Sequence, residues 1–171
     1  MSTRDALAVG RGMPASVLRV AILAVGAAII IVPLSEGVTV GPLVVLLPAV
    51  LASAYAPASP APAGVVIAAA AFAALADGDP LRVAVLLLIP LVHLFHITCG
   101  LASVVPAAGR LHLRALRAPA FRFLQVQGVM AVLVILASLL PTGRTAPVFE
   151  AVGLLGLALI AVLVVWFQRV K

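Results

Sequence analysis

Long apolar runs, separated by prolines, glycines and short polar turns, dominate this chain. The pattern predicts six helical segments, at about residues 17–34, 42–56, 63–76, 80–105, 123–140 and 147–168. Prolines mostly fall at the edges of these runs, where the missing N–H is harmless or a helix has to stop. Pro48 and Pro90 are the ones inside predicted spans. The turns are short except for residues 106–122.

The composition explains why the runs are read as membrane spans. Of 171 residues, 65% are apolar and 9% are charged, and a soluble fold cannot cover so much hydrocarbon with so few charges. The chain is therefore predicted to be an all-α, polytopic transmembrane helix bundle, with residues 1–171 forming one transmembrane domain. The net charge of +6 does not indicate nucleic-acid binding, because the charges are scattered between spans and no aromatic platform accompanies them.

The second and third segments are shorter than the others. Each has roughly 15 apolar residues, or about 22 Å of helix, against a hydrocarbon core of about 30 Å. Their connection, residues 57–62, has three prolines and no charge. It could be the tip of a re-entrant hairpin or a plain cytoplasmic turn. Six helices, two of them short, is the preferred reading.

The distribution of arginine and lysine predicts the orientation. Six crossings with the N-terminus inside put nine of the eleven cations in the cytoplasm and only Arg82 and Arg144 outside, which agrees with the positive-inside rule. No cleavage site follows the first run, so we expect an uncleaved signal anchor. The prediction is a multi-pass protein of the bacterial cytoplasmic membrane with both termini inside.

Three polar side chains, His93, His96 and Cys99, lie at the centre of the fourth segment. Successive members are about 60° apart on a helix, so they line one side of it, and ionisable groups at this depth normally face the bundle interior. The structural interpretation is that each imidazole forms a hydrogen bond with a serine, threonine, glutamine or carbonyl of a neighbouring helix. The alternatives are a metal or haem site completed by a second copy, and a proton or ion path. Cys99 is the sole cysteine, which excludes dithiol chemistry within one chain.

The loop predicted at 106–122 is rich in arginine. Arg110, Arg114 and Arg117 share a helical face, and Arg122 follows, so we expect a short interfacial helix in this cytoplasmic loop. These arginines would anchor the loop and contact anionic lipid head groups. The more specific hypothesis is that these arginines form a docking site for an acidic membrane or cytoplasmic protein partner.

Some smaller features carry structural expectations. Ala24 and Ala28 are spaced for a close helix contact, and Gln125 and Gln127 suit hydrogen bonding between helices. Asp79 is expected to cap the helix that Pro80 begins.

The stretches His93-Leu94, Arg114-Ala115-Leu116-Arg117-Ala118-Pro119 and Arg122-Phe123-Leu124-Gln125-Val126-Gln127 resemble small membrane proteins encoded beside MoxR-type AAA+ ATPases in high-G+C Gram-positive bacteria. The resemblance covers about the second half of the chain. It implies a membrane partner in an ATPase-linked assembly or envelope process, and it brings no catalytic residues with it.

The leading functional hypothesis is a non-enzymatic membrane scaffold or partner-docking subunit, able to form homo-oligomers, with no cofactor. The chain has no phosphate-binding glycine loop, no constellation for nucleophilic catalysis and no carboxylate within a span. The competing hypothesis is a metal, haem or ion-translocating protein centred on His93 and His96.

Overall fold

A computed structural model describes residues 12–38, 44–75, 79, 81–106, 109–139 and 155 of the chain. The chain divides into two compact units, residues 1–135 and 136–171. The helices and strands given below lie in the first unit, except that the last turn of the final helix continues into the second.

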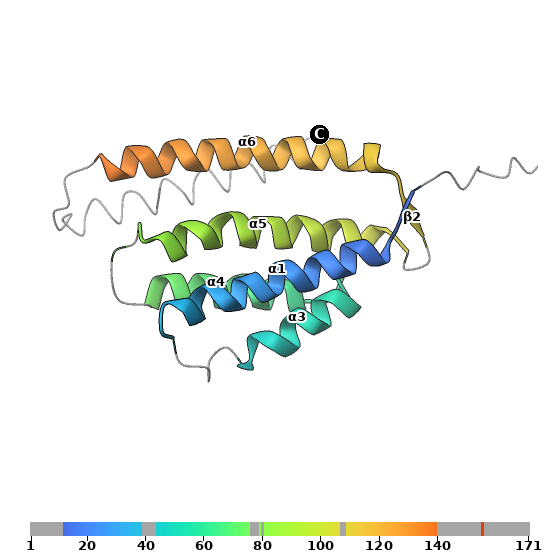
Figure 1. Ribbon diagram of the computed structural model, residues 1–171, viewed down its shortest axis with the longest axis horizontal. Helices are drawn as coiled ribbons and strands as arrows, with labels where there is room; N and C mark the ends of the chain where they lie inside the picture. Colours follow the sequence, from blue (N-terminus) through green and yellow to red (C-terminus); the bar gives the residue numbers. More distant parts are fainter. Residues whose placement is uncertain are drawn as a thin grey trace, which may run out of the picture. The chain divides into compact units, whose positions relative to one another are not determined.

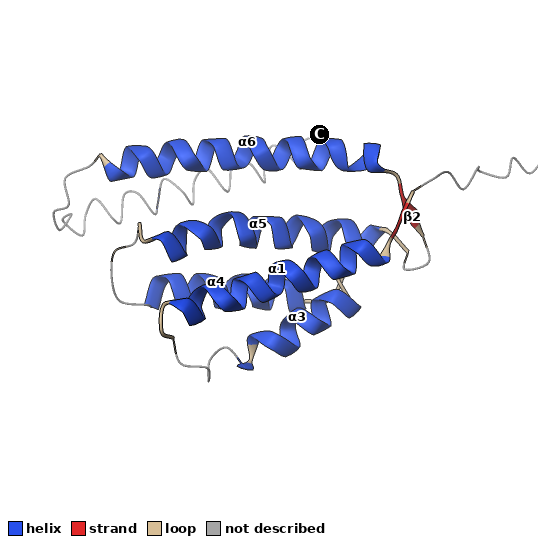
Figure 2. Ribbon diagram, in the orientation of Figure 1, coloured by secondary structure: helices blue, strands red, loops and turns tan. Residues whose placement is uncertain are grey.

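Helices make up nearly all of the described structure (Figures 1 and 2). They are α1 (Ser16–Ser35), α3 (Leu46–Tyr55), α4 (Ala61–Leu75), α5 (Val83–Val104) and α6 (Leu113–Ser138). The two-residue strands β1 (Met13–Pro14) and β2 (Arg110–Leu111) form one antiparallel pair. The predicted all-α class is therefore confirmed, and five predicted segments correspond to these helices. The sixth, 147–168, lies outside the described residues.

Three of these helices are long and apolar enough to cross a bilayer: α1, α5 and α6. This supports the prediction of a membrane protein. Helices α3 and α4 are apolar but have only 10 and 15 residues, or about 15 and 22 Å of helix. As the apolar runs indicated, both are shorter than a hydrocarbon core of about 30 Å.

The arginine-rich segment differs from the prediction. Residues 113–122 were expected to form part of a loop before a span that begins at 123, whereas α6 is continuous from Leu113 through Pro119 to Ser138. A proline costs a helix one N–H donor and crowds the preceding turn, but the neighbouring alanines, leucines and arginines are among the best helix formers. Helical propensity on both sides of Pro119 therefore outweighs the break. Pro33 also lies inside a helix, in the last turn of α1.

The buried core is formed by α1, α3, α4 and α5. It joins the side chains Leu18, Ile22 and Ile29 of α1, Leu46, Val50 and Ala54 of α3, Val65 and Ala69 of α4, and Leu88, Phe95, Cys99 and Ala102 of α5, together with Leu111 of β2. Helix α1 packs against both α3 and α5. No described residue of α6 is buried, although Leu116 contacts the core from its first turns. Helix α6 is thus peripheral to the packed bundle.

Contacts at one end of the bundle join the start of α1 to the connection between α5 and α6. The Ala15 N–H donates to the Gly109 carbonyl at 3.0 Å, beside the β1–β2 pair. Arg19 Nη1 donates to the carbonyls of Ala54 and Tyr55 at 3.1 and 3.0 Å, and so satisfies carbonyls that the end of α3 leaves unpaired. We call this the arginine end; its cations are Arg19, Arg110, Arg114, Arg117 and Arg122.

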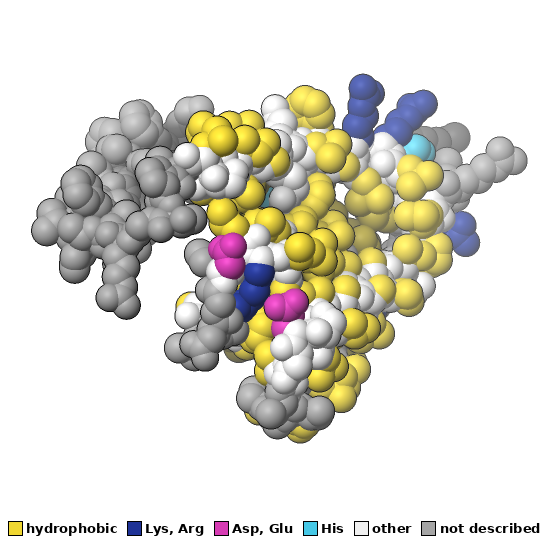
Figure 3. Space-filling view, turned by 60° about the vertical axis from the view of Figure 1, so that its left-hand side comes forward, with side chains coloured by type: hydrophobic (Ala, Val, Ile, Leu, Met, Phe, Trp, Pro, Cys, Tyr) yellow, Lys and Arg dark blue, Asp and Glu magenta, His cyan; other side chains and the backbone are white. Residues whose placement is uncertain are grey.

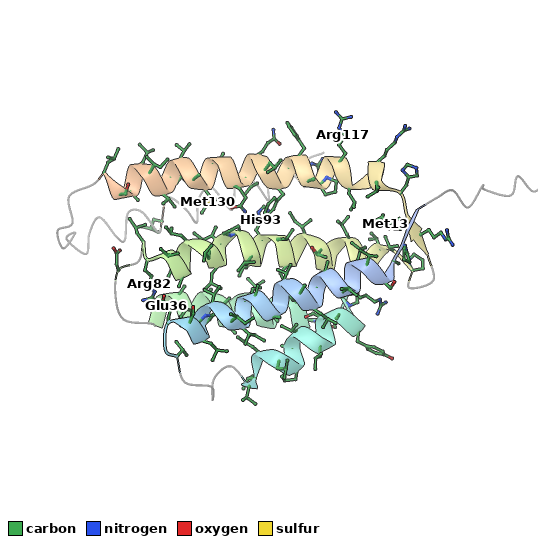
Figure 4. All side chains as sticks on the ribbon, viewed as in Figure 1. Met13, Glu36, Arg82, His93, Arg117 and Met130 are labelled. Carbon is green, nitrogen blue, oxygen red and sulfur yellow. The ribbon has the colours of Figure 1, made fainter. Side chains whose placement is uncertain are left out.

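The opposite end is held by Arg82. Its Nε lies 3.8 Å from Glu36 Oε2, and its guanidinium carbon lies 5.7 Å from the centroid of the Phe72 ring. These contacts connect the ends of α1 and α4 to the start of α5 (Figure 4). We call this the Glu36–Arg82 end. Figure 3 turns the left-hand side of Figure 1 forward and shows acidic and basic side chains close together there, further basic side chains at the upper right, and apolar side chains over much of the surface between them.

Asp79 has a different role from the predicted helix cap. Its side chain accepts a hydrogen bond from the Leu81 N–H at 2.8 Å, and its carbonyl accepts one from the Arg82 N–H at 3.1 Å. Because α5 begins at Val83 rather than at Pro80, Asp79 stabilises the turn before the helix.

Gly26 lets α1 and α3 approach closely. A Cβ placed there would meet Val50 Cγ2 at 2.9 Å and the other methyl group still more closely, and Val50 is 2% exposed. The close contact lies at Gly26 rather than at Ala24, which is exposed, or Ala28, which is half-buried. Small residues serve this purpose in membrane proteins because lipid leaves no hydrophobic force to drive helices together.

We therefore expect Gly26→Ala to destabilise the protein by about 1–3 kcal/mol, the usual cost of overpacking a rigid contact. Thermal unfolding in detergent would measure this as a lower Tm. The control is Gly100→Ala in α5, where an added Cβ meets nothing within 4 Å. In the Gly100→Ala protein, the gain of about 1 kcal/mol in helix propensity should leave the Tm unchanged or raise it. Equal effects of the two changes would contradict the assigned contact.

Candidate functional site

His93 forms the polar contact between α5 and α6. Gln127 Nε2 lies 2.9 Å from His93 Nδ1, and the His93 and Phe123 rings lie 5.1 Å apart between centroids at an angle of 38°. Figure 4 places His93 between the two helices. An amide nitrogen only donates hydrogen bonds, so with this orientation Nδ1 is the acceptor and the proton of the neutral ring is on Nε2.

His96 and Cys99 have other surroundings. Cys99 is 2% exposed and belongs to the buried core, whereas His96 is exposed. The three polar side chains expected to line one side of α5 therefore have different neighbours. The spread of about 120° between His93 and Cys99 is enough to turn one toward α6 and the other into the core. Within the described residues, no three His, Cys, Asp or Glu side chains are grouped so that they could hold a metal ion.

Two open pockets flank α5. One, of about 520 Å³, lies between α4 and α5 and is lined by His93 and His96 among apolar side chains. The other, of about 470 Å³, lies between α5 and α6 and includes Pro90, Phe123, Gln127 and Met130. Pro90 lines the second pocket, and His93 reaches both the α4 side and the α6 side of α5.

The arginines of the predicted loop are exposed. Arg110 lies in β2, and Arg114, Arg117 and Arg122 lie on the first turns of α6. Arg117 points away from the bundle in Figure 4. Arg19, by contrast, is half-buried and holds the end of α3. The exposed four form a cationic surface of the first unit that is free to meet lipid head groups or another protein.

The outer surface of α6 is apolar beyond these arginines. Phe121, Leu124 and Val129 are each more than 60% exposed. In water such a patch would be a liability, but lipid chains solvate it well. The helix therefore has two zones, one cationic and one suited to lipid.

Some important contacts had weak sequence signals. Gln127 was expected to bond between helices, but the sequence did not identify His93 as its partner. The roles of Gly26, Arg19 and the Glu36–Arg82 pair were missed. A single glycine in the middle of an apolar run was the available signal for Gly26, whereas a pairing between residues 46 apart in sequence, such as Glu36 and Arg82, leaves no local pattern.

Comparison of the chain with protein-family models, with curated proteins and with solved structures finds no match. Function must therefore be inferred from composition, charge distribution and side-chain contacts. Among these, the α5–α6 contact and the arginine end are the most specific.

Removal of the α5–α6 hydrogen bond should loosen α6. We expect Gln127→Leu to destabilise the protein by about 0.6 kcal/mol, and by no more than about 1.7 kcal/mol, the range measured for hydrogen bonds between transmembrane helices. A double-mutant cycle with His93→Phe should show coupling of that size. Gln125→Leu is the matched control, since Gln125 is an exposed amide on the same helix. Additive effects of the His93 and Gln127 changes would show that the bond contributes nothing.

Proposed function

We propose that this protein is a multi-pass protein of a bacterial cytoplasmic membrane that docks a partner through its arginine end, without catalysis of its own. The observation that carries the proposal is the group of four exposed arginines on β2 and the first turns of α6. These turns belong to a helix with no buried described residue. A partner could therefore reach them without disturbing the core.

The ends of the bundle support a cytoplasmic position for this surface. Among the described residues, five arginines gather at the arginine end, while the opposite end has Glu36, Asp79 and Arg82. Arginine-rich ends stay in the cytoplasm during insertion. The start of α1 belongs to the same end, so the N-terminus would be inside. A sixth crossing by residues 147–168 would return the C-terminus to the same side.

Contacts of α3 and α4 favour two short crossings over a re-entrant hairpin. The end of α3 accepts hydrogen bonds from Arg19 at the arginine end, and Phe72 of α4 contacts Arg82 at the opposite end. Helix α4 therefore leads from the end of α3 toward the Glu36–Arg82 end, which supports two short crossings. Local thinning of the bilayer would accommodate its short helices.

The same arginines would bind anionic lipid first and an acidic protein afterwards. Each exposed arginine near an anionic leaflet contributes about 1 kcal/mol of attraction, which would hold the first turns of α6 at the interface. An acidic partner would exchange lipid contacts for ion pairs. The resemblance of this segment to proteins encoded beside AAA+ ATPases makes an ATPase-linked partner our preferred candidate.

The orientation can be tested with single cysteines. In a Cys99→Ala background, which removes the sole cysteine, Ser35→Cys should react with an impermeant maleimide in intact cells. His112→Cys should react only after permeabilisation. Ser35 is the exposed last residue of α1, and His112 lies in the connection before α6. The reverse pattern of labelling would overturn the proposed orientation.

Docking can be tested with a photoreactive amino acid in native membranes. Placed at Arg117, it should yield a protein adduct that disappears when Arg114→Glu is added or when salt is high, because screening weakens exposed ion pairs. Val132, an exposed apolar residue of the same helix, is the matched position and should yield lipid adducts. Lipid adducts alone at Arg117, or a protein adduct indifferent to Arg114→Glu, would contradict docking through this surface.

A further inference from the structure

The pocket between α4 and α5 has the size and lining of a ligand site. Its volume is about 520 Å³, within the range of roughly 300–1,000 Å³ common for small-molecule sites. Helix α4 contributes one valine and three alanines, and the pocket is open on this side because these side chains are short. Helix α5 contributes four larger apolar residues and two imidazoles. The lining comprises Val66, Ala69, Ala70, Ala73, Val85, Leu88, Ile89, Val92, His93 and His96.

The pocket opens to the surroundings of the bundle at mid-helix depth. Ala70 and His96 line it and are exposed. His93 and His96 stand ten and thirteen residues beyond Val83, the first residue of α5, or about 15 and 20 Å along the helix. If α5 spans a hydrocarbon core of about 30 Å, a ligand would enter from the lipid. Head groups at the bilayer surface would not reach this depth.

The two imidazoles are available as hydrogen-bonding groups. The bond from Gln127 occupies Nδ1 of His93 and leaves the Nε2–H as a donor. In the described part of the chain, the His96 ring has no hydrogen-bond partner. An unpaired imidazole in hydrocarbon costs free energy. A ligand oxygen could form a hydrogen bond with it and lower this cost, whereas lipid tails cannot.

The lining also restricts the charge of a ligand. No charged side chain is among the residues that line the pocket, and an ion without a partner would be poorly solvated there. The occupant should therefore be neutral, largely apolar, and equipped with an acceptor oxygen for the His93 donor. Ring carbonyls on a lipid-soluble molecule meet all three requirements.

We propose that the pocket between α4 and α5 binds a neutral, lipid-soluble compound with ring carbonyls, of the quinone class, through His93 and His96. This site is separate from the arginine end and does not depend on the proposed docking function. The Gln127 bond holds one ring nitrogen of His93, so α6 contributes to the site by positioning this ring.

The test is saturable binding of labelled decylubiquinone to the full-length protein in neutral phospholipid nanodiscs. Ala70→Leu should fill the opening and weaken binding at least about tenfold, the loss expected when a ligand hydrogen bond and its fit are removed together. Ala71→Leu is the matched control, because Ala71 is an exposed alanine of the same helix that does not line the pocket. It should leave binding within about twofold of the parent protein.

A second pair of variants tests the imidazole. His96→Leu should weaken binding about tenfold or more, while His112→Leu, in the connection before α6, should leave it unchanged. Circular dichroism and gel filtration would verify that each variant keeps its fold. Decylbenzene, which has the same tail without carbonyls, should not compete.

Three results would overturn the proposal. They are absence of saturable binding, equal affinities of the Ala70→Leu and Ala71→Leu proteins, and competition by decylbenzene as strong as that by the quinone. The last result would show an apolar groove filled by lipid chains.

Discussion

The contact between His93 and Gln127 is a hydrogen bond that joins α5 to α6 near the middle of both helices. Helix α6 supplies no buried residue, and lipid provides no hydrophobic force to hold its apolar surface against the other helices. The two helices are instead joined by a hydrogen bond of 2.9 Å and by the adjoining contact between the His93 and Phe123 rings. The bond also gives His93 a polar partner at a depth where an unpaired imidazole would be costly.

The four-helix core uses a different principle. Gly26 admits Val50 to the surface of α1. The buried hydroxyls of Ser53 and Thr98 donate to the carbonyls of Ala49 and Leu94, each one turn earlier in its own helix. Close backbone approach and internally satisfied polar groups are what a bilayer demands. At the two ends of this core, Arg19 and Arg82 make polar contacts to neighbouring elements.

The first unit presents two candidate functional surfaces. The arginine end is exposed, cationic and suited to acidic partners, while the pocket beside His96 is apolar and accessible at mid-helix depth. Helix α6 contributes arginines to the first surface, and its Gln127 contacts His93, which lines the pocket.

Much of this organisation could be predicted from local patterns. Apolar runs, prolines and charge counts indicated an all-α membrane protein, the approximate helices and the arginine-rich segment, because bilayer length and the cost of burying charge act on each segment separately. The continuity of α6 through Pro119 could not be predicted, since local breakers and helix formers conflicted there.

The sequence by itself determined that the protein is helical, apolar enough for a membrane and polar at His93, His96 and the arginine segment. Tertiary structure alone decided that His93 faces Gln127, that Cys99 is buried in the core, and that Arg19 and Arg82 bridge opposite ends. The reason is geometric: residues about 60° apart on one helix can meet different neighbours, and which neighbour each meets depends on how the other helices pack. Partners 34 to 46 positions apart, as in His93–Gln127 and Glu36–Arg82, leave no local periodicity to read.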